Sequence, residues 1–334
     1  MNDLLTTARV DRDRAGSLRH LGRAVTGALV SVTLVVVLSF FLFRVLPGDP
    51  VLTMTRGRPV GAQQIAELRA QLGLDRSLPE QFASYLTALL HGDLGTSYQF
   101  RRPVAELIGQ RIGPTVLLVG TATVLAVLLG FWQGARAGWW RGGRFDRASV
   151  GVALTLWSVP PFLLGLGALV VFAGGLGLFP ARGIRSPTTT LPVALDVTHH
   201  LMLPCLTLAA AIYAQYLLVM RASLLDERDA DYLVTARAKG LREDDVLLRH
   251  AVPNAILPTV TVIFLHLGLV VSGAVAVEAV FSWPGLGLLL YEALRATDLP
   301  LLQGTFLVIC GSVIAMNLLG DLLCRMLDPR LRAS

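Results

Sequence analysis

Lysine is almost missing from this 334-residue chain. Of its 29 basic residues, 28 are arginine, and Lys239 is the only lysine. A phosphate-binding P-loop requires the pattern GxxxxGK[ST], in which the lysine reaches the phosphates. Lys239 is preceded by alanine and followed by glycine, so the sequence contains no P-loop. This absence excludes a P-loop ATPase within the chain itself.

Charged residues and cysteine are scarce too. Charged residues make up 16% of the chain, against about a quarter in a typical soluble protein. Hydrophobic residues reach 54% with a mean hydropathy of +0.62, which neither a soluble domain nor a disordered chain would carry. The three cysteines, Cys205, Cys310 and Cys324, lie in or beside apolar runs without metal-like spacing. The sequence predicts a membrane protein with no disulfide framework, zinc site or cofactor.

Six apolar stretches are each long enough to cross a bilayer core, which needs about 20 helical residues. They lie at about 21–46, 114–133, 148–174, 201–220, 258–280 and 302–323. The first stretch follows a basic segment, as a signal peptide does. Its apolar core is longer than the usual 7 to 15 residues and no small-residue cleavage site follows, so a retained span is favoured. Because lipid offers no partner for open backbone groups, the predicted fold is an all-α membrane protein with six spans.

The basic residues predict the orientation of these spans. A cytoplasmic N-terminus places residues 1–23, 134–147, 222–255 and 322–334 inside. These segments hold five, four, five and three Lys or Arg residues, against three in the short outer loops 176–200 and 281–301. Positive residues favour the cytoplasmic side, so both termini are predicted to be cytoplasmic in a cell membrane. A nucleic-acid partner is not predicted, because only the pI near 9.7 favours one.

The loop between spans 1 and 2 is too long for a simple connector. It covers residues 47–110 and contains two stretches with helical spacing, QQIAELRAQLGL and PEQFASYLTALLHG. We therefore predict an external helical segment. The other predicted divisions are an N-terminal extension (1–20), span 1 (21–46), a transmembrane core (111–325) and a cytoplasmic tail (326–334).

The inner loop between spans 4 and 5, residues 222–255, is the most distinctive part of the chain. It contains DYLVTARAKGLREDDVLLRH, in which an alanine-rich helical stretch is followed by Gly240 and then by renewed helical periodicity. Two short helices joined at the glycine are predicted. From the residues alone, this hairpin is either a docking element or an ordinary surface feature.

Candidates for a hinge or a transport pathway are few. Pro160 and Pro161 fall near the middle of span 3 and predict a kink, which either serves transport or only fits neighbouring helices. Glu278 lies near the end of span 5, where it is either functional or interhelical. Three polar residues, Gln215, Ser272 and Asn317, either line a pathway or bond helices together. The kink and the intramembrane acids keep an ion-coupled secondary carrier as an alternative.

Several motifs resemble those of one transport family. Ala236, Gly240 and Pro253 match the spacing of the inner-loop signature in permease subunits of ATP-driven (ABC) importers. Val234 and Thr235 depart from the general signature and are similar to its peptide-importer branch. Further similar motifs, in order, are LPGDP at 46–50, GDLGTS at 92–97, RPV at 102–104, EAVFSWPGLG at 278–287, DLL at 321–323 and LDPR at 327–330.

The chain therefore resembles the first, B-type permease of a dipeptide, oligopeptide or nickel importer. The resemblance implies pairing with a second related permease, two ATPase subunits and an external substrate-binding protein. It also implies that the inner loop contacts the ATPase. The implied coupling residues are Asp231, Tyr232, Ala236, Ala238, Lys239, Gly240, Pro253 and Asn254, with the two alanines allowing close approach. Peptides are the expected substrate class, with nickel or glutathione as alternatives.

Overall fold

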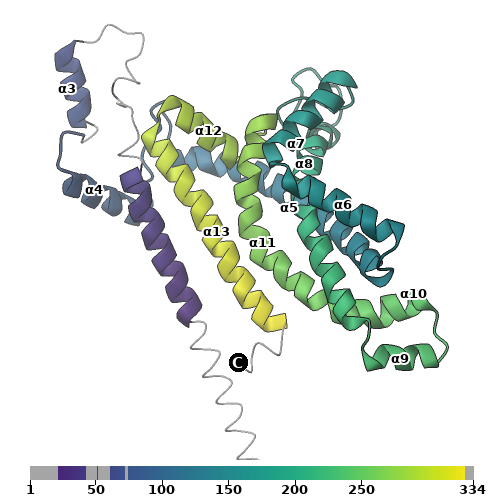
Figure 1. The fold of residues 1–334 in the computed structure, drawn as a ribbon. Coiled ribbons are helices and arrows are strands. Elements are labelled where there is room, and N and C mark those ends of the chain that lie inside the picture. Colours follow the sequence, from purple (N-terminus) through teal and green to yellow (C-terminus); the bar gives the residue numbers. More distant parts are fainter. Residues whose placement is uncertain (1–21, 43–50, 52–60, 72–73, 328–334) are drawn as a thin grey trace, which may run out of the picture.

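The computed structural model describes residues 22–42, 51, 61–71 and 74–327, and every regular element in them is helical (Figure 1). The helices are Gly22–Leu42, α3 (Ala62–Gln71), α4 (Leu78–Leu90), α5 (Val104–Trp139), α6 (Arg144–Ser158), α7 (Pro161–Ala168), α8 (Val193–Glu227), α9 (Asp231–Ala238), α10 (Glu243–Val246), α11 (Val252–Phe281), α12 (Leu286–Ala296) and α13 (Leu299–Leu327), with π-helical turns η1 (Leu169–Gly175) and η2 (Leu247–Ala251). Four of them are long and apolar enough to cross a membrane, and the count reaches six if two bent pairs each form one span. The predicted all-helical membrane protein is confirmed at this level.

Helix α5 begins ten residues before the predicted start of span 2. Pro114 was expected in the first turn, but it lies inside a helix that starts at Val104. The apolar residues Val104, Leu107 and Ile108 are buried and follow the i, i+3, i+4 spacing of a helix face. Two charged residues lower the hydropathy of this segment, which is why the apolar run alone placed the boundary too late. Part of the predicted external segment 47–110 therefore belongs to α5.

The predicted kink in span 3 is a sharp turn. Helix α6 ends at Ser158, α7 begins at Pro161, and the two directions differ by 101°. Proline supplies no backbone donor and clashes with the preceding turn, so the double proline ends one helix and starts the next. A second bend, of 75°, separates the end of α11 from α12. In α11, Pro258 lies inside the helix, six residues after its start, and not at the start of a span.

Helices α5 and α8 form the central pair of the fold. Three glycines, Gly130, Gly134 and Gly138, face α8 at four-residue spacing. A Cβ added to them would lie 2.8 Å from Tyr216 Cβ, 2.5 Å from the Leu217 carbonyl oxygen and 2.9 Å from the Arg221 carbonyl oxygen, respectively. The two backbones therefore touch, as small residues at four-residue spacing allow in membrane helices. The order of these contacts shows that α5 and α8 run in the same direction.

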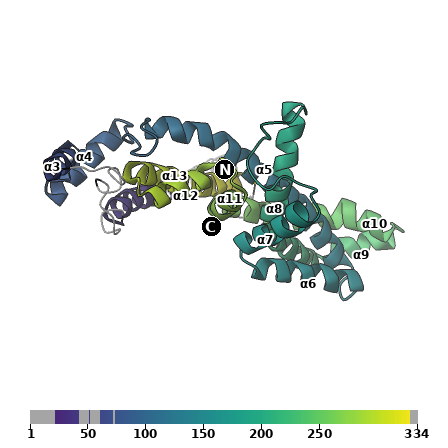
Figure 2. The ribbon, with the colours of Figure 1, turned by 90° about the horizontal axis from the view of Figure 1, so that it is seen from above.

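The described part of the segment 47–110 contains the two predicted helices, α3 and α4. Helix α4 packs on the helix Gly22–Leu42, with the Phe40 and Phe82 ring centroids 5.1 Å apart and Ser39 Oγ 3.1 Å from the Tyr85 hydroxyl. Viewed from above, α3 and α4 lie at one end of an elongated molecule and α9 and α10 at the other (Figure 2). The N-terminal extension 1–20, the LPGDP motif and the last residues of the tail lie outside the described residues.

Candidate functional site: the α9 loop

The candidate site is built around α9, the first of the two short helices predicted in the inner loop. Asp231 provides a negative charge in its first turn, which interacts favourably with the helix dipole. The helix ends at Ala238, and Gly240 adopts a left-handed φ of +80°, which only glycine adopts without strain. The chain turns there and enters α10. The predicted break at Gly240 is confirmed, but the stretch after it is not a separate short helix, because α10, η2 and α11 form one continuous helical run from Glu243 to Phe281.

One face of α9 is buried in its own chain. Leu233 and Ala236 belong to an apolar cluster with residues from α5, α8, η2 and α11, including Trp139 and Leu224. Ala236 is only 5% exposed. It therefore lets α9 approach the long helices closely, whereas the sequence suggested that it lies against a partner protein. This cluster fixes the helix on the ends of α5 and α8.

Two polar contacts hold the ends of α9. At its start the Tyr232 hydroxyl donates to Glu227 Oε2 of α8 at 2.5 Å. Partial burial of the phenol and this hydrogen bond raise the pKa of Tyr232 to about 12, so the phenol remains a neutral donor at physiological pH. Near the other end, Arg237 Nε donates to Glu243 Oε1 at 3.0 Å. The Arg237 guanidinium also lies 5.3 Å from the Trp139 ring centroid, within cation–π range.

The opposite face of α9 and its flanks are exposed. Of the residues predicted to couple, the exposed ones are Asp231, Tyr232, Ala238, Lys239, Gly240, Pro253 and Asn254. Apolar side chains are exposed among them, with Val234 57% and Leu248 65% accessible. The loop 222–255 holds five basic and seven acidic residues. The result is a fixed, mixed apolar and charged surface of the kind that protein partners bind.

A buried ion pair reinforces this end of the molecule. Arg221 of α8 donates from Nε to Asp146 Oδ1 at 2.7 Å and from Nη2 to Asp146 Oδ2 at 3.0 Å. The Gly142 backbone N–H donates to Asp146 Oδ2 at 2.9 Å. Arg221 lies ten residues before α9. Its two hydrogen bonds to Asp146 therefore connect the start of α6 with the part of α8 that leads into the loop.

The predicted hinge or pathway residues lie on different elements. Pro160 and Pro161 form the break between α6 and α7, and Glu278 is fully buried at the end of α11. Gln215 is half-buried on α8, whereas Asn317 is exposed on α13. A Cβ added to Gly268 would lie 2.8 Å from Asn317 Oδ1, so Asn317 faces α11. Ser272 lies on α11, and its side chain is outside the described set.

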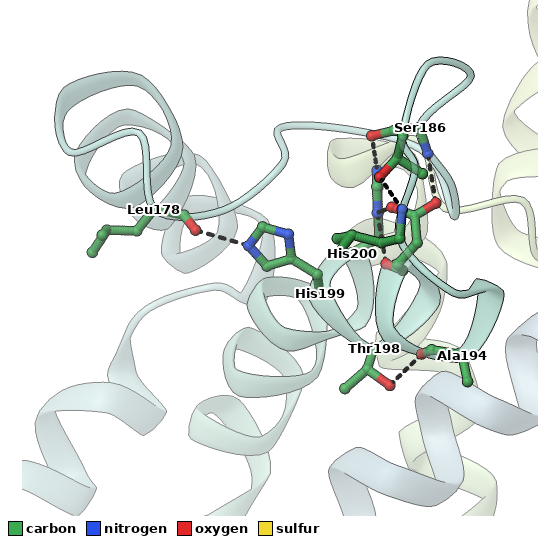
Figure 3. A network of polar contacts seen from close by, with 9 residues as sticks. Leu178, Ser186, Ala194, Thr198, His199 and His200 are labelled. Atoms are coloured by element: carbon green, nitrogen blue, oxygen red, sulfur yellow. Dashed lines mark hydrogen bonds and ion pairs between the residues drawn. The ribbon is translucent and has the colours of Figure 1, made fainter.

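The structure also joins three residues that the sequence did not connect: Ser186, Asp196 and His200 (Figure 3). Ser186 Oγ lies 3.4 Å from His200 Nε2, and His200 Nδ1 lies 3.2 Å from Asp196 Oδ1. His200 Nδ1 is also 2.9 Å from the Asp196 carbonyl oxygen, and Asp196 Oδ2 accepts the Ser186 N–H at 3.0 Å. Asp196 and His200 are buried. This network fastens the loop before α8 to the first turns of α8.

Comparison with known proteins places these features in a family. Residues 114–333 match the family described as "Binding-protein-dependent transport system inner membrane component", and residues 17–119 match its N-terminal region. The chain belongs to this family. The permease is 39% identical over 310 residues to a putative peptide permease protein of Brucella suis, covering 92% of the chain and 96% of that protein.

Two further relatives carry a more specific name. The permease is 38% identical over 315 residues to glutathione transport system permease proteins of Pectobacterium atrosepticum and of Escherichia coli O6:H1. Each alignment covers 94% of the permease and 99% of the relative. The resemblance inferred from the motifs is thereby confirmed: the chain is a permease subunit of the ABC importer type. Such a subunit belongs to the inner membrane and works with ATPase activity that resides on separate subunits.

Proposed function

We propose that this permease forms half of a translocation pathway for short peptides, with a second related permease forming the other half. Two ATPase subunits bind on the cytoplasmic side, and an external binding protein delivers the substrate. In this arrangement each bent helix pair counts as one span, giving six, and both termini are cytoplasmic. The distribution of basic residues supports this orientation.

The observation that carries the proposal is the construction of the α9 loop. Its apolar face is packed on α5 and α8, and its other face presents Val234, Lys239 and their neighbours to the surroundings. A hairpin that served only as a surface turn would not need this anchoring to two long helices. The anchoring lets force applied to the exposed face reach the spans, as a rigid-body switch between inward and outward openings requires.

Peptides are the proposed substrate class because of the names of two groups of relatives. One is named a peptide permease and the other a glutathione transport system permease, and glutathione is itself a short peptide. We expect cells that produce the complete importer to accumulate labelled dipeptides, oligopeptides or glutathione, with at least a tenfold loss on deletion of this chain. Uptake of nickel but of no peptide would contradict the peptide assignment. Uptake that survives ATP depletion but collapses with the ion gradient would favour a secondary carrier.

Docking of the ATPase is expected to depend on the exposed face of α9. Val234→Glu places a charge where an apolar partner surface would meet it, without touching the buried cluster. We expect this variant to insert normally but to lose at least about tenfold in ATPase affinity, since losing a buried contact and burying a charge costs more than 1.4 kcal/mol. The measurement is co-purification of the ATPase subunits with tagged permease.

The matched control for this substitution is Leu90→Glu. Leu90 is 79% exposed at the end of α4, on the part of the molecule farthest from α9 (Figure 2). Leu90→Glu should leave ATPase co-purification unchanged. Equal ATPase recovery with Val234→Glu and the wild type would refute the assignment of α9 as the docking helix.

A further inference from the structure

Helix α5 contacts both the α9 loop and the corner between α11 and α12. At the α9 end, Trp139 is the last residue of α5 and is only 5% exposed. Its ring lies under the guanidinium of Arg237, which also pairs with Glu243 of α10. A displacement of α9 therefore acts directly on the end of α5.

Eleven residues after its start at Val104, α5 is hydrogen-bonded through Thr115 to the corner between α11 and α12. The Thr115 hydroxyl donates to Glu278 Oε1 at 2.7 Å and accepts the Leu286 N–H at 2.8 Å. One residue earlier, the Pro114 carbonyl oxygen accepts from Trp283 Nε1 at 2.9 Å. Thr115 and Glu278 are both buried. A single hydroxyl thus connects α5 with the last turn of α11 and the first turn of α12.

Both carboxylate oxygens of Glu278 accept hydrogen bonds at this corner. Its Oε2 accepts the backbone N–H groups of Gly287 at 2.6 Å and Leu288 at 3.4 Å. These are free donors at the start of α12, where a negative charge is favoured. A Cβ on Gly285 would lie 2.2 Å from Glu278 Oε1. Any side chain at position 285 would therefore collide with the carboxylate, and glycine leaves room for it. Glu278, which the sequence suggested as a pathway candidate, therefore stabilises the contact between α5, α11 and α12.

Between Thr115 and Trp139, α5 contains no proline, and its own Pro114 lies one residue before that segment. Its 36 residues are packed on α8 through the three glycines, where the backbones already touch, and close packing transmits displacement. Helix α11 also connects α9 with the corner, but it starts at the π-helical turn η2 and contains Pro253 and Pro258 near that end. Prolines and π-turns interrupt the hydrogen-bond ladder and create kinks.

We propose that movement of α9 reaches the α11–α12 corner through α5, and that Thr115 is the positioning residue that transmits it. This inference rests on the proposed function, because it assumes that an ATPase moves α9. It adds a defined route and assigns Thr115, Glu278 and Trp139 to it. The corner opens or closes as one unit with α5 because the Thr115 hydroxyl bonds both of the helices that meet there.

The test uses the importer purified with its partner subunits through a tag on this chain and reconstituted in proteoliposomes. The readout is the ratio of ATP hydrolysis with and without the substrate-loaded binding protein. Thr115→Val keeps the side-chain shape but removes the hydroxyl, and it should lower this ratio about fivefold, the lower end of typical coupling between sites. Thr115→Ser keeps the hydroxyl and should restore the ratio. Thr155→Val, an exposed position on α6, is the matched control and should have no effect.

A double-mutant cycle tests whether Arg237 of α9 and Thr115 of α5 lie on one route. Arg237→Gln should also lower the ratio, and the double variant with Thr115→Val should fall no further than the larger single effect. Trp283→Phe removes the donor to Pro114 and should act like Thr115→Val, which keeps the test informative if that variant folds poorly.

The possible results separate this inference from the proposed function. If the substrate-loaded binding protein does not stimulate ATP hydrolysis by the wild-type importer, both the proposed function and the α5 route are overturned. If the wild-type importer is stimulated and the Thr115→Val and Trp283→Phe variants show the same ratio of ATP hydrolysis as the wild type, only the α5 route is overturned. Single effects that multiply in the double variant also overturn it, because they show that Arg237 and Thr115 act independently.

Discussion

Replacing Gly134 by leucine is expected to prevent stable folding of this permease. A Cβ at this position would already lie 2.5 Å from the Leu217 carbonyl oxygen and 2.9 Å from Met220 Cβ. Both neighbours belong to the backbone or base of α8, so they cannot rotate away, and α5 and α8 must separate along their length. Overpacking of this kind costs about 3 kcal/mol or more. The expected result is a large fall in the thermal unfolding midpoint in detergent, or no recoverable protein.

The control for this prediction lies on the same helix. Gly120 has nothing within 4 Å of its virtual Cβ and is exposed, so Gly120→Leu should leave the unfolding midpoint within the range of the wild type. Gly134→Ala should already be destabilising, whereas Gly120→Ala should not. Comparable unfolding midpoints for the two leucine variants would show that α5 and α8 do not pack through the glycine face.

Breaking the Asp146–Arg221 ion pair is expected to produce the second large effect on stability. Asp146 is 5% and Arg221 25% exposed, so removing the carboxylate charge leaves a largely desolvated guanidinium without its counter-charge. Loss of one partner of a buried pair costs roughly 3 to 5 kcal/mol, and the partial exposure of Arg221 places Asp146→Asn near the lower figure. The unfolding midpoint of purified permease measures this change.

Two comparisons make the ion-pair prediction specific. Asp245→Asn breaks an exposed pair with Arg249, whose side chains are 38% and 73% accessible, and should change stability by less than about 1 kcal/mol. The double variant Asp146→Asn with Arg221→Gln should be less destabilised than the sum of the single variants. Additive single effects would mean that the two side chains do not act as a pair.

Local patterns in the sequence predicted several elements correctly. Gly240 was predicted to separate two short helices, and the structure shows it at a φ of +80° between α9 and α10. The double proline at 160 and 161 was predicted to kink its span. These features follow from the backbone chemistry of one or two residues, which sequence reasoning captures. The start of α5 was placed too late because Glu106 and Arg111 lower the hydropathy of its first ten residues.

The links between elements could not be read from the sequence. Asp146 pairs with Arg221, 75 positions away, and Thr115 bonds Glu278, 163 positions away. Nothing in local spacing relates such residues. Ala236 shows the same limit, because its place in the loop signature was visible but the direction it faces depends on how α9 packs on α5 and α8. The sequence therefore indicated the α9 loop as the candidate site and left its attachment to the spans open.

The length of α5 has a consequence for where the loop lies relative to the lipid. At about 1.5 Å per residue, its 36 residues measure about 54 Å, whereas the hydrocarbon layer is about 30 Å thick. Even a tilt of about 40°, the upper end for membrane helices, leaves a projected height of about 40 Å. Helix α8, with 35 residues, runs beside it in the same direction. The pair is therefore longer than the hydrocarbon layer is thick, so the end that carries α9 can reach the headgroup region, where a polar loop meets water.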